Sequence, residues 1–301
     1  MYHLATVFPI IRKVRIPVSR DQAMLIMAAI NLIFLGIDIY LAHSISRTIV
    51  PNEWIPIIFG PIAGALVLFM ILISLRWKNF SSIVLTIIFM LSIAVGLLGF
   101  YFHIMRGLAP SGPPGEQVSI PLLVWAPPFV APLTFSLVGL WGIASAWKEH
   151  PPESGTLQLI GKARFRFPIS KSRAFFFMVG LGILACVVSA VLDHARAGFQ
   201  IRWLWFPVIT GLFGMVSALS LGFISKPKHS DLVIFVIAMC LLILTGVLGS
   251  YFHFDSILTP QGLFVMERFI RGAPFLAPLL FADMGGLGLV MMMNADDEHP
   301  G

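Results

Sequence analysis

Charged residues are scarce in this chain. Only 11% of its 301 residues are Asp, Glu, Lys or Arg, whereas 58% are hydrophobic. Soluble globular domains carry about 25% charged residues, so this composition excludes an ordinary soluble protein. The apolar residues also gather in runs of about twenty, which is the length that crosses a bilayer as a helix.

Cysteine and the common cofactor motifs are scarce as well. The two cysteines, Cys186 and Cys240, both lie inside apolar runs and predict packing residues, not a disulfide. The C-x-x-C-H motif is absent, which excludes covalent haem attachment by the usual motif. The H-E-x-x-H motif of metalloproteases is absent too. Residues 1–22 lack an apolar core followed by a small-residue cleavage site, so we expect no removed signal peptide.

The apolar runs predict an all-α integral membrane protein with eight transmembrane helices. The predicted spans are about Ala23–Ser46, Trp54–Arg76, Phe80–Ile104, Leu123–Trp147, Arg173–Arg196, Trp203–Ile224, Asp231–Phe254 and Pro274–Met293. Of the 20 Lys and Arg residues, 14 lie before the first span or in the loops that share its side of the membrane. The positive-inside rule therefore predicts that both termini are cytoplasmic. The same asymmetry accounts for the net charge of +6, so we expect no nucleic-acid partner.

Three sequence matches in the same order predict a tandem repeat. VRIPVSR, GLLGFYFH and PFVAPLTF in the first half match FRFPISK, GVLGSYFH and PFLAPLLF in the second, at offsets of 151, 150 and 146 residues. Each repeat has an even number of spans, so we expect two four-helix halves with the same topology. We assign residues 1–150 and 173–301 to the two repeats. Residues 151–172 form a cytoplasmic linker, either a short hairpin or a solvated basic segment.

Four histidines are predicted at the outer ends of the odd-numbered spans. His43 and His194 end the first and fifth spans, and His103 and His253 end the third and seventh. Taken singly, each histidine fits the common role of an interfacial ring with its polar atoms in water. The pairing favours a ligand role instead, because neutral imidazoles from two helices can hold one iron from both sides.

Glycines lie on the same helix face as two of these histidines. Gly96 and Gly99 share an arc of roughly 60° with His103, at about 100° per residue. Gly246 and Gly249 repeat the arc below His253. Small residues mark a face that packs against a neighbouring helix or a bound group, so we expect room for the edge of a macrocycle. The predicted cofactor is non-covalent haem b, with one site per half.

A non-haem metal ion is the alternative cofactor, because carboxylates lie close to the histidines in sequence. Asp193 precedes His194, and Asp255 follows His253 by two residues, a mixture that suits iron, zinc or manganese. Asp38 lies about 140° around its helix from His43, so both cannot face one ion.

Two carboxylates are predicted within the membrane. Asp283 lies near the middle of the last span, and Asp38 lies below the outer end of the first. Charge at this depth is costly, so each carboxylate faces a packed interior or a cavity. They predict either a proton or ion path or hydrogen-bonded packing residues.

The leading hypothesis is a redox subunit of a larger membrane complex, which passes electrons between an outer partner and a quinone. As a membrane protein it would also contact lipid. No catalytic domain is visible, so we expect no enzyme activity from this chain by itself. The alternatives are a transporter of ions or small molecules, and a structural or assembly subunit without a cofactor. Tandem repeats, buried carboxylates and proline-broken spans all occur in carriers.

Overall fold

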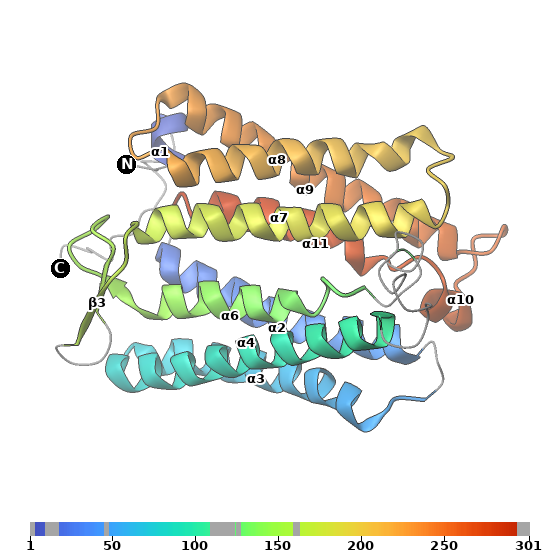
Figure 1. Cartoon of the computed structure of the whole chain (residues 1–301), viewed down its shortest axis with the longest axis horizontal. Coiled ribbons are helices and arrows are strands. Elements are labelled where there is room, and N and C mark those ends of the chain that lie inside the picture. The colour runs from blue at the N-terminus through green and yellow to red at the C-terminus, as the bar shows by residue number, and fades with distance from the viewer. Residues whose placement is uncertain are drawn as a thin grey trace.

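The protein is a bundle of helices whose axes are roughly aligned and whose chain direction alternates from one long helix to the next (Figure 1). The structure is a computed structural model that describes residues 4–9, 18–44, 48–108, 124, 128–158 and 163–293. Within this part of the chain, six helical segments are long and apolar enough to cross a membrane. They are α2 (Arg20–Ser44), η2 with α3 (Pro51–Glu53 and Trp54–Ser74), α4 (Lys78–Leu108), α7 (Lys171–Ala195), η3 with α8 (Arg202–Trp205 and Phe206–Phe223) and α9 (His229–Ile257). The structure is mostly helical (Figure 1), and its six long apolar helices are consistent with the predicted all-α membrane protein.

In the described residues, the other two predicted spans contain shorter helices, α6 (Leu133–Ala146, 14 residues) and α11 (Leu276–Val290, 15 residues). Residues 123 and 125–127 of the predicted span Leu123–Trp147 lie outside the described residues. At 1.5 Å per residue the two helices are roughly 21–23 Å long, less than the hydrocarbon core of about 30 Å. Proline explains the difference, because Pro132 is the N-cap of α6 and Pro278 lies in the first turn of α11. Proline lacks the N–H group that would extend a helix backwards.

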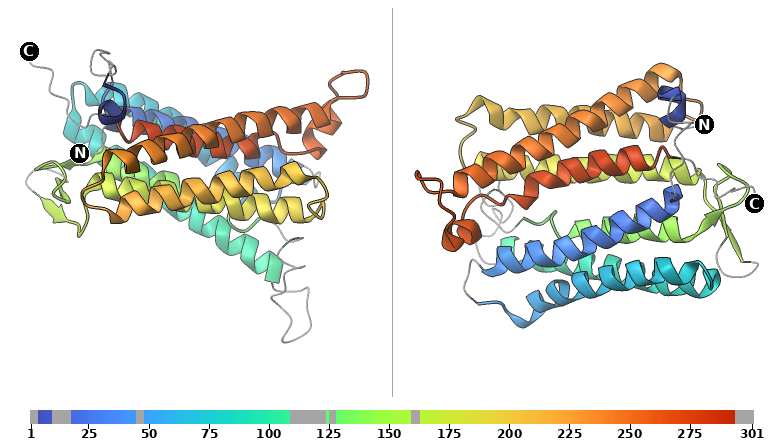
Figure 2. Two further views of the ribbon diagram at one scale, coloured as in Figure 1. Left: turned by 90° about the horizontal axis from the view of Figure 1, so that it is seen from above. Right: turned by 180° about the vertical axis from the view of Figure 1, so that it is seen from behind.

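Short elements lie at the two ends of the bundle. At one end β1 (Lys148–Glu149), β2 (Thr156–Gln158) and β3 (Arg164–Arg166) form an antiparallel sheet in the order β1-β2-β3. The segment predicted as a hairpin or solvated linker thus contains paired strands, and residues 159–162 lie outside the described chain. At the opposite end lies α10 (Met266–Arg271), as both views show (Figures 1 and 2). The remaining short helix is α1 (Leu4–Val7), whose Leu4 N–H donates to Met292 O at 2.8 Å.

The helices pack as two groups of four with matching neighbours. Helices α2 and α4 each contact both α3 and α6, so α2 and α4 lie diagonally opposite. Helices α7 and α9 each contact both α8 and α11, which gives the same diagonal arrangement. Large aromatic side chains fill the interior, including Phe135, Trp141, Phe175, Phe176 and Phe235. Large apolar side chains such as Phe34, Ile62, Leu72 and Ile87 are exposed on the outside, as a lipid-facing surface requires.

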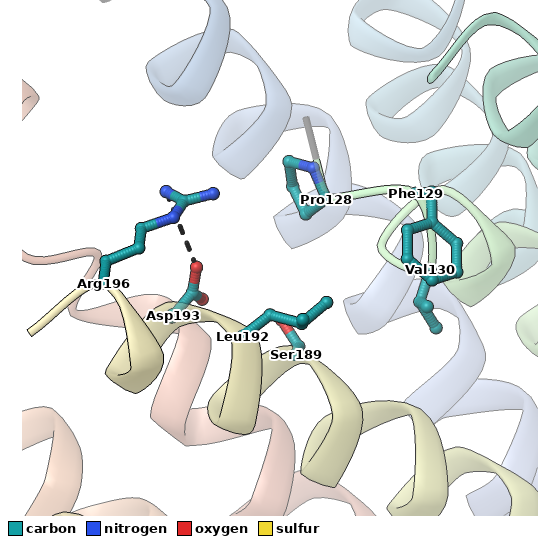
Figure 3. A pocket seen from close by; sticks show the side chains of 7 residues that line it. All are labelled: Pro128, Phe129, Val130, Ser189, Leu192, Asp193 and Arg196. Carbon is teal, nitrogen blue, oxygen red and sulfur yellow. Dashed lines mark ion pairs between the residues drawn. The ribbon is translucent and has the colours of Figure 1, made fainter. Parts of the chain in front are cut away.

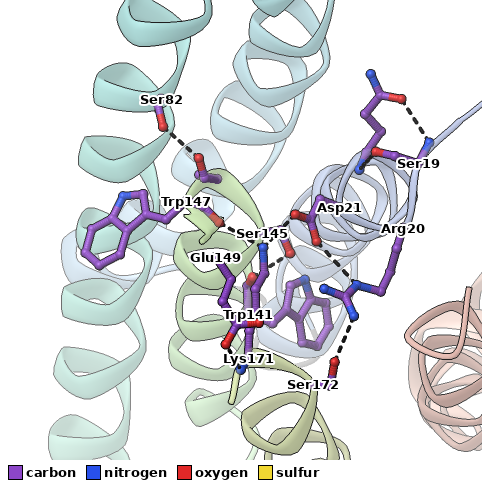
Figure 4. Close-up of polar contacts among 12 residues, drawn as sticks. Ser19, Arg20, Asp21, Ser82, Trp141, Ser145, Trp147, Glu149, Lys171 and Ser172 are labelled. Carbon is purple, nitrogen blue, oxygen red and sulfur yellow. Dashed lines mark hydrogen bonds and ion pairs between the residues drawn. The ribbon is translucent and has the colours of Figure 1, made fainter. Parts of the chain in front are cut away.

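The two groups meet at the sheet end through two polar contacts between α2 and α7. Arg20 Nη1 donates to Ser172 Oγ at 2.9 Å, and Lys171 Nζ donates to Asp21 Oδ2 at 2.6 Å (Figure 4). Both cations also lie over the ring of Phe175, at 5.5 and 5.8 Å from its centroid. At the 151-residue offset Arg20 aligns with Lys171 and Asp21 with Ser172. Each contact is therefore the counterpart of the other, as across a two-fold axis.

A second reciprocal pair lies deeper in the bundle. Asn31 on α2 donates from Nδ2 to Asp283 Oδ1 on α11 at 2.9 Å. When the two halves are aligned, Asn31 corresponds to Gly182 on α7 and Asp283 corresponds to Leu137 on α6. These two residues are also close, because a Cβ on Gly182 would lie 2.8 Å from Leu137 Cδ2. One side of the junction between the two groups is thus polar and the other apolar at the same level.

Candidate functional site

The four histidines lie near the C-terminal ends of α2, α4, α7 and α9, and all four helices run away from the sheet (Figure 1). His43 and His103 come together across the first group of helices, with ring centroids 6.1 Å apart and ring planes at 59°. Two imidazoles that hold one metal from opposite sides need their ligating nitrogens about 4 Å apart, at roughly 2 Å per metal–nitrogen bond. A ring separation of 6.1 Å allows this.

Backbone carbonyls set the tautomer of three of the rings. His43 Nδ1 lies 2.9 Å from Ile39 O, His103 Nδ1 lies 3.0 Å from Pro128 O, and His253 Nδ1 lies 3.1 Å from Pro274 O. A carbonyl only accepts, so Nδ1 carries the proton and the lone pair is on Nε2 in the neutral ring. Metal-ligating histidines commonly have this arrangement, in which the second nitrogen donates to a carbonyl that fixes the ring.

Proline spacing supplies two of these carbonyls. In a helix the Pro128 carbonyl would accept from the N–H group four residues later, but that residue is Pro132, which has no N–H. Pro274 and Pro278 have the same spacing. Both carbonyls instead accept from the residue three positions later at 3.2 Å, from Ala131 N and Ala277 N, and from the histidine ring. The repeated P-x-x-x-P spacing therefore orients His103 and His253, a role that sequence reasoning missed.

The second pair is less regular than the first. The ring of His194 packs edge-on against the ring of Phe199, with the ring centroids 6.0 Å apart. Its Nδ1 is buried and has no hydrogen-bond partner in the part of the chain that the structure describes. The two pairs are therefore not equivalent in detail.

The glycines below the histidines do not provide room for a macrocycle, and that expectation is wrong. A Cβ on Gly96 would lie 2.6 Å from Ser136 N, and one on Gly99 would lie 2.8 Å from Pro132 Cβ. Gly246 and Gly249 meet Ala282 and Pro278 of α11 in the same way, at 2.5 and 2.8 Å. These glycines allow α4 and α9 to approach the proline-containing ends of α6 and α11 closely. They thereby bring His103 and His253 to their carbonyl partners.

The carboxylates predicted as metal ligands do not gather around the histidines. Across the described residues, no group of three or more His, Cys, Asp or Glu is arranged to hold a metal ion. Asp255 is exposed. Asp38 is half-buried on α2, apart from the ring of His43 by its angle around the helix. Glu53, at the start of α3, was not predicted, yet its Oε1 lies 3.7 Å from His43 Nε2.

Asp193 lines a pocket between the two groups of helices. Pro128, Phe129 and Val130 form one wall, and Ser189, Leu192, Asp193 and Arg196 at the end of α7 form the other (Figure 3). Its volume of about 10 Å³ is close to the space that one water molecule needs and far below the 300–1,000 Å³ that is typical of ligand sites. Asp193 pairs with Arg196 at 3.8 Å. Arg196 also donates to Val124 O at 2.8 Å.

Asp283 lies on the side of α11 that faces α2. Along the bundle, it is farther from the α10 end than the four histidines are. One carboxylate oxygen accepts from Asn31, whose Nδ2 also donates to Met27 O at 3.0 Å. The other, Oδ2, is buried without a hydrogen-bond partner among the described residues. The structure thus separates the polar side chains at the histidine end from the Asp283 carboxylate, whose Oδ2 is buried inside the bundle.

No protein-family model, curated protein or solved structure matches this chain, so its function is inferred from the residues of the site itself.

Proposed function

We propose that this protein is a membrane subunit that binds haem b or a metal ion through His43 and His103 and carries electrons within a larger complex. The observation that carries this proposal is the convergence of the two rings from diagonal helices, 6.1 Å apart. Both rings also donate from Nδ1 to backbone carbonyls. Haem iron supplies the one-electron chemistry, and the chain supplies two imidazoles in a fixed tautomer.

His194 and His253 form the corresponding site of the second half. Its support is the carbonyl of Pro274, which holds His253 as Pro128 holds His103. The less regular surroundings of His194 make this site the weaker ligand pair, so the two sites would differ in potential. A membrane quinone and an outer protein partner are the electron donor and acceptor that we propose.

The proposal includes eight membrane-embedded helices as two tandem four-helix repeats. Matching helix neighbours and the reciprocal contacts at Arg20 and Lys171 support it. The shorter α6 and α11 are counted as the fourth and eighth spans, completed at the histidine end by the proline-containing turns. The positive-inside rule places both termini and the sheet in the cytoplasm and the histidines near the outer surface.

Absorption spectroscopy of the protein purified from membranes tests the haem proposal. We expect a Soret band that shifts on reduction, and His103→Ala should remove the chromophore of the first site. His229→Ala is the matched control, because His229 starts α9 at the opposite end of the bundle, and its spectrum should be unchanged. A colourless preparation, or a spectrum that His43→Ala and His103→Ala both leave intact, would overturn the assignment. A colourless protein with a histidine-dependent metal ion would replace haem by a metal site.

A further inference from the structure

Polar side chains line one face of α7 where the two groups of helices meet. Gly182, Cys186, Ser189 and Asp193 follow the spacing i, i+4, i+7, i+11, which keeps them within roughly 60° of one another. Gly182 is packed against Leu137 and Met284. Ser189 and Asp193 line the pocket at the histidine end (Figure 3). The face therefore extends from that pocket into the middle of the bundle.

Asp283 lies at the inner end of this face. On α7, Cys186 lies one turn beyond Gly182, which packs against Met284, the neighbour of Asp283. Asn31 on α2 donates to Asp283 Oδ1 at 2.9 Å. Asp38, seven residues after Asn31, lies on the same face of α2 and nearer the histidine end. Helix α9 packs on the other side of α11 and presents Phe235, Met239 and Ile243 there.

Packing alone does not require this carboxylate. The counterpart contact at the same level, Gly182 with Leu137, joins the two groups of helices through apolar atoms. A buried carboxylate without a full set of hydrogen bonds is costly in an apolar interior. Its Oδ2 has no partner in the described part of the chain. An acid retained where an apolar contact suffices points to a function for its proton.

We propose that Asp283 is a proton-binding site inside the membrane that exchanges its proton with the histidine end of the bundle along this face of α7. A proton from water at the pocket adds to Oδ2 and converts the carboxylate to a neutral carboxylic acid, while Asn31 keeps its hydrogen bond to Oδ1. Ser189 lines the pocket, and Cys186 lies one turn closer to the acid on the same face of α7; both side chains can donate and accept. This inference does not rest on the haem proposal.

Infrared spectroscopy of the full chain in lipid nanodiscs tests the site. We expect a carboxylic-acid C=O band that titrates with pH and is lost in Asp283→Asn. The double variant Asn31→Gly with Asp283→Leu copies the apolar counterpart contact, so it should fold and also lack the band. Asp38→Asn is the matched control and should keep the band. If the Asp283→Asn protein and the parent have the same band, or if the band does not change with pH, the proposal is wrong.

Hydrogen–deuterium exchange tests the route. Transfer of the protein into D₂O should shift the Asp283 band, and the double variant Ser189→Ala with Cys186→Ala should slow this shift. Ser145→Ala is the control, because Ser145 lies on α6 near the sheet and donates to Trp141 O. An exchange rate that is the same in the double variant and the parent would overturn the route along α7.

Discussion

Single glycines fix how closely the helices approach beside the histidines. A Cβ at Gly96 would meet backbone atoms of α6, Ser136 N at 2.6 Å and Pro132 O at 2.9 Å. Backbone cannot move aside as a flexible side chain can, so α4 and α6 would have to separate. The glycine side of α4 is therefore a packing surface that positions His103.

Gly96→Ala should lower the free energy of unfolding by about 1–3 kcal/mol through this overpacking. Gly286→Ala is the control, because its Cβ would meet only Met27 Cε at 3.7 Å, an ordinary contact. Alanine is also favoured over glycine inside a helix by roughly 0.5–1 kcal/mol. Unfolding of both variants in mixed detergent micelles measures the difference. Equal stability of the two variants would contradict the close approach.

The sequence predicted that the four histidines lie at helix ends but not what surrounds them. Their position at helix ends and their repetition were visible in GLLGFYFH and GVLGSYFH. The role of the glycines was not visible in the sequence. A small residue predicts a close neighbour, but it does not say whether that neighbour is a helix or a cofactor. Glu53 was missed because it precedes α3 and reaches His43 only through the fold.

At the scale of whole helices, the ends of α6 and α11 depart most from the sequence prediction. Hydropathy continues through the proline-containing segments, so it predicted two full spans. The structure begins the helices at Leu133 and Leu276. The effect of the prolines could not be predicted from the sequence. It depends on which carbonyls lose an N–H partner and on which side chains lie close enough to donate in its place.

Pro132→Ala should restore an N–H group that competes with His103 for the Pro128 carbonyl. We expect a weaker hydrogen bond to Nδ1 and therefore a changed His103 side-chain signal in nitrogen NMR, with little loss of stability. Pro207→Ala is the control, because Pro207 opens α8, and its variant should leave that signal unchanged. An unaltered His103 signal in Pro132→Ala would show that the proline does not control this carbonyl.

For the molecule as a whole, the contact between α2 and α7 is a buried polar connection between the two groups of helices. Lys171 is only 3% exposed and is held by Asp21 and by Trp147 O at 2.8 Å. Glu149 of β1 accepts from the backbone N–H groups of Lys171 and Gly155, at 3.0 and 2.6 Å. The sheet and the helix junction are thus one hydrogen-bonded unit (Figure 4).

Asp21→Ala should destabilise the protein by about 3–5 kcal/mol, because it leaves a buried ammonium group without its carboxylate. Asp255→Asn is an exposed control and should change stability by less than about 0.5 kcal/mol. Thermal unfolding of both variants in the same detergent measures this difference. A small effect of Asp21→Ala would mean that Trp147 O alone satisfies Lys171.

Labelling of single cysteines tests the proposed orientation of the bundle. In a background with Cys186 and Cys240 replaced by alanine, Ser154→Cys lies at the sheet end and Gln261→Cys at the end near α10. An impermeant thiol reagent should label Gln261→Cys in intact cells and Ser154→Cys only after the membrane is opened. The reverse pattern would invert the orientation and place the histidines on the cytoplasmic side.

The unequal contacts on the two sides of the central axis have an evolutionary consequence. Two identical four-helix subunits would have to present the same residues at both of their mutual contacts, since symmetry repeats every substitution. A continuous polypeptide escapes that constraint. It can hold Asn31 with Asp283 on one flank and Gly182 with Leu137 on the opposite flank, so a single chain can carry an acid on one side alone.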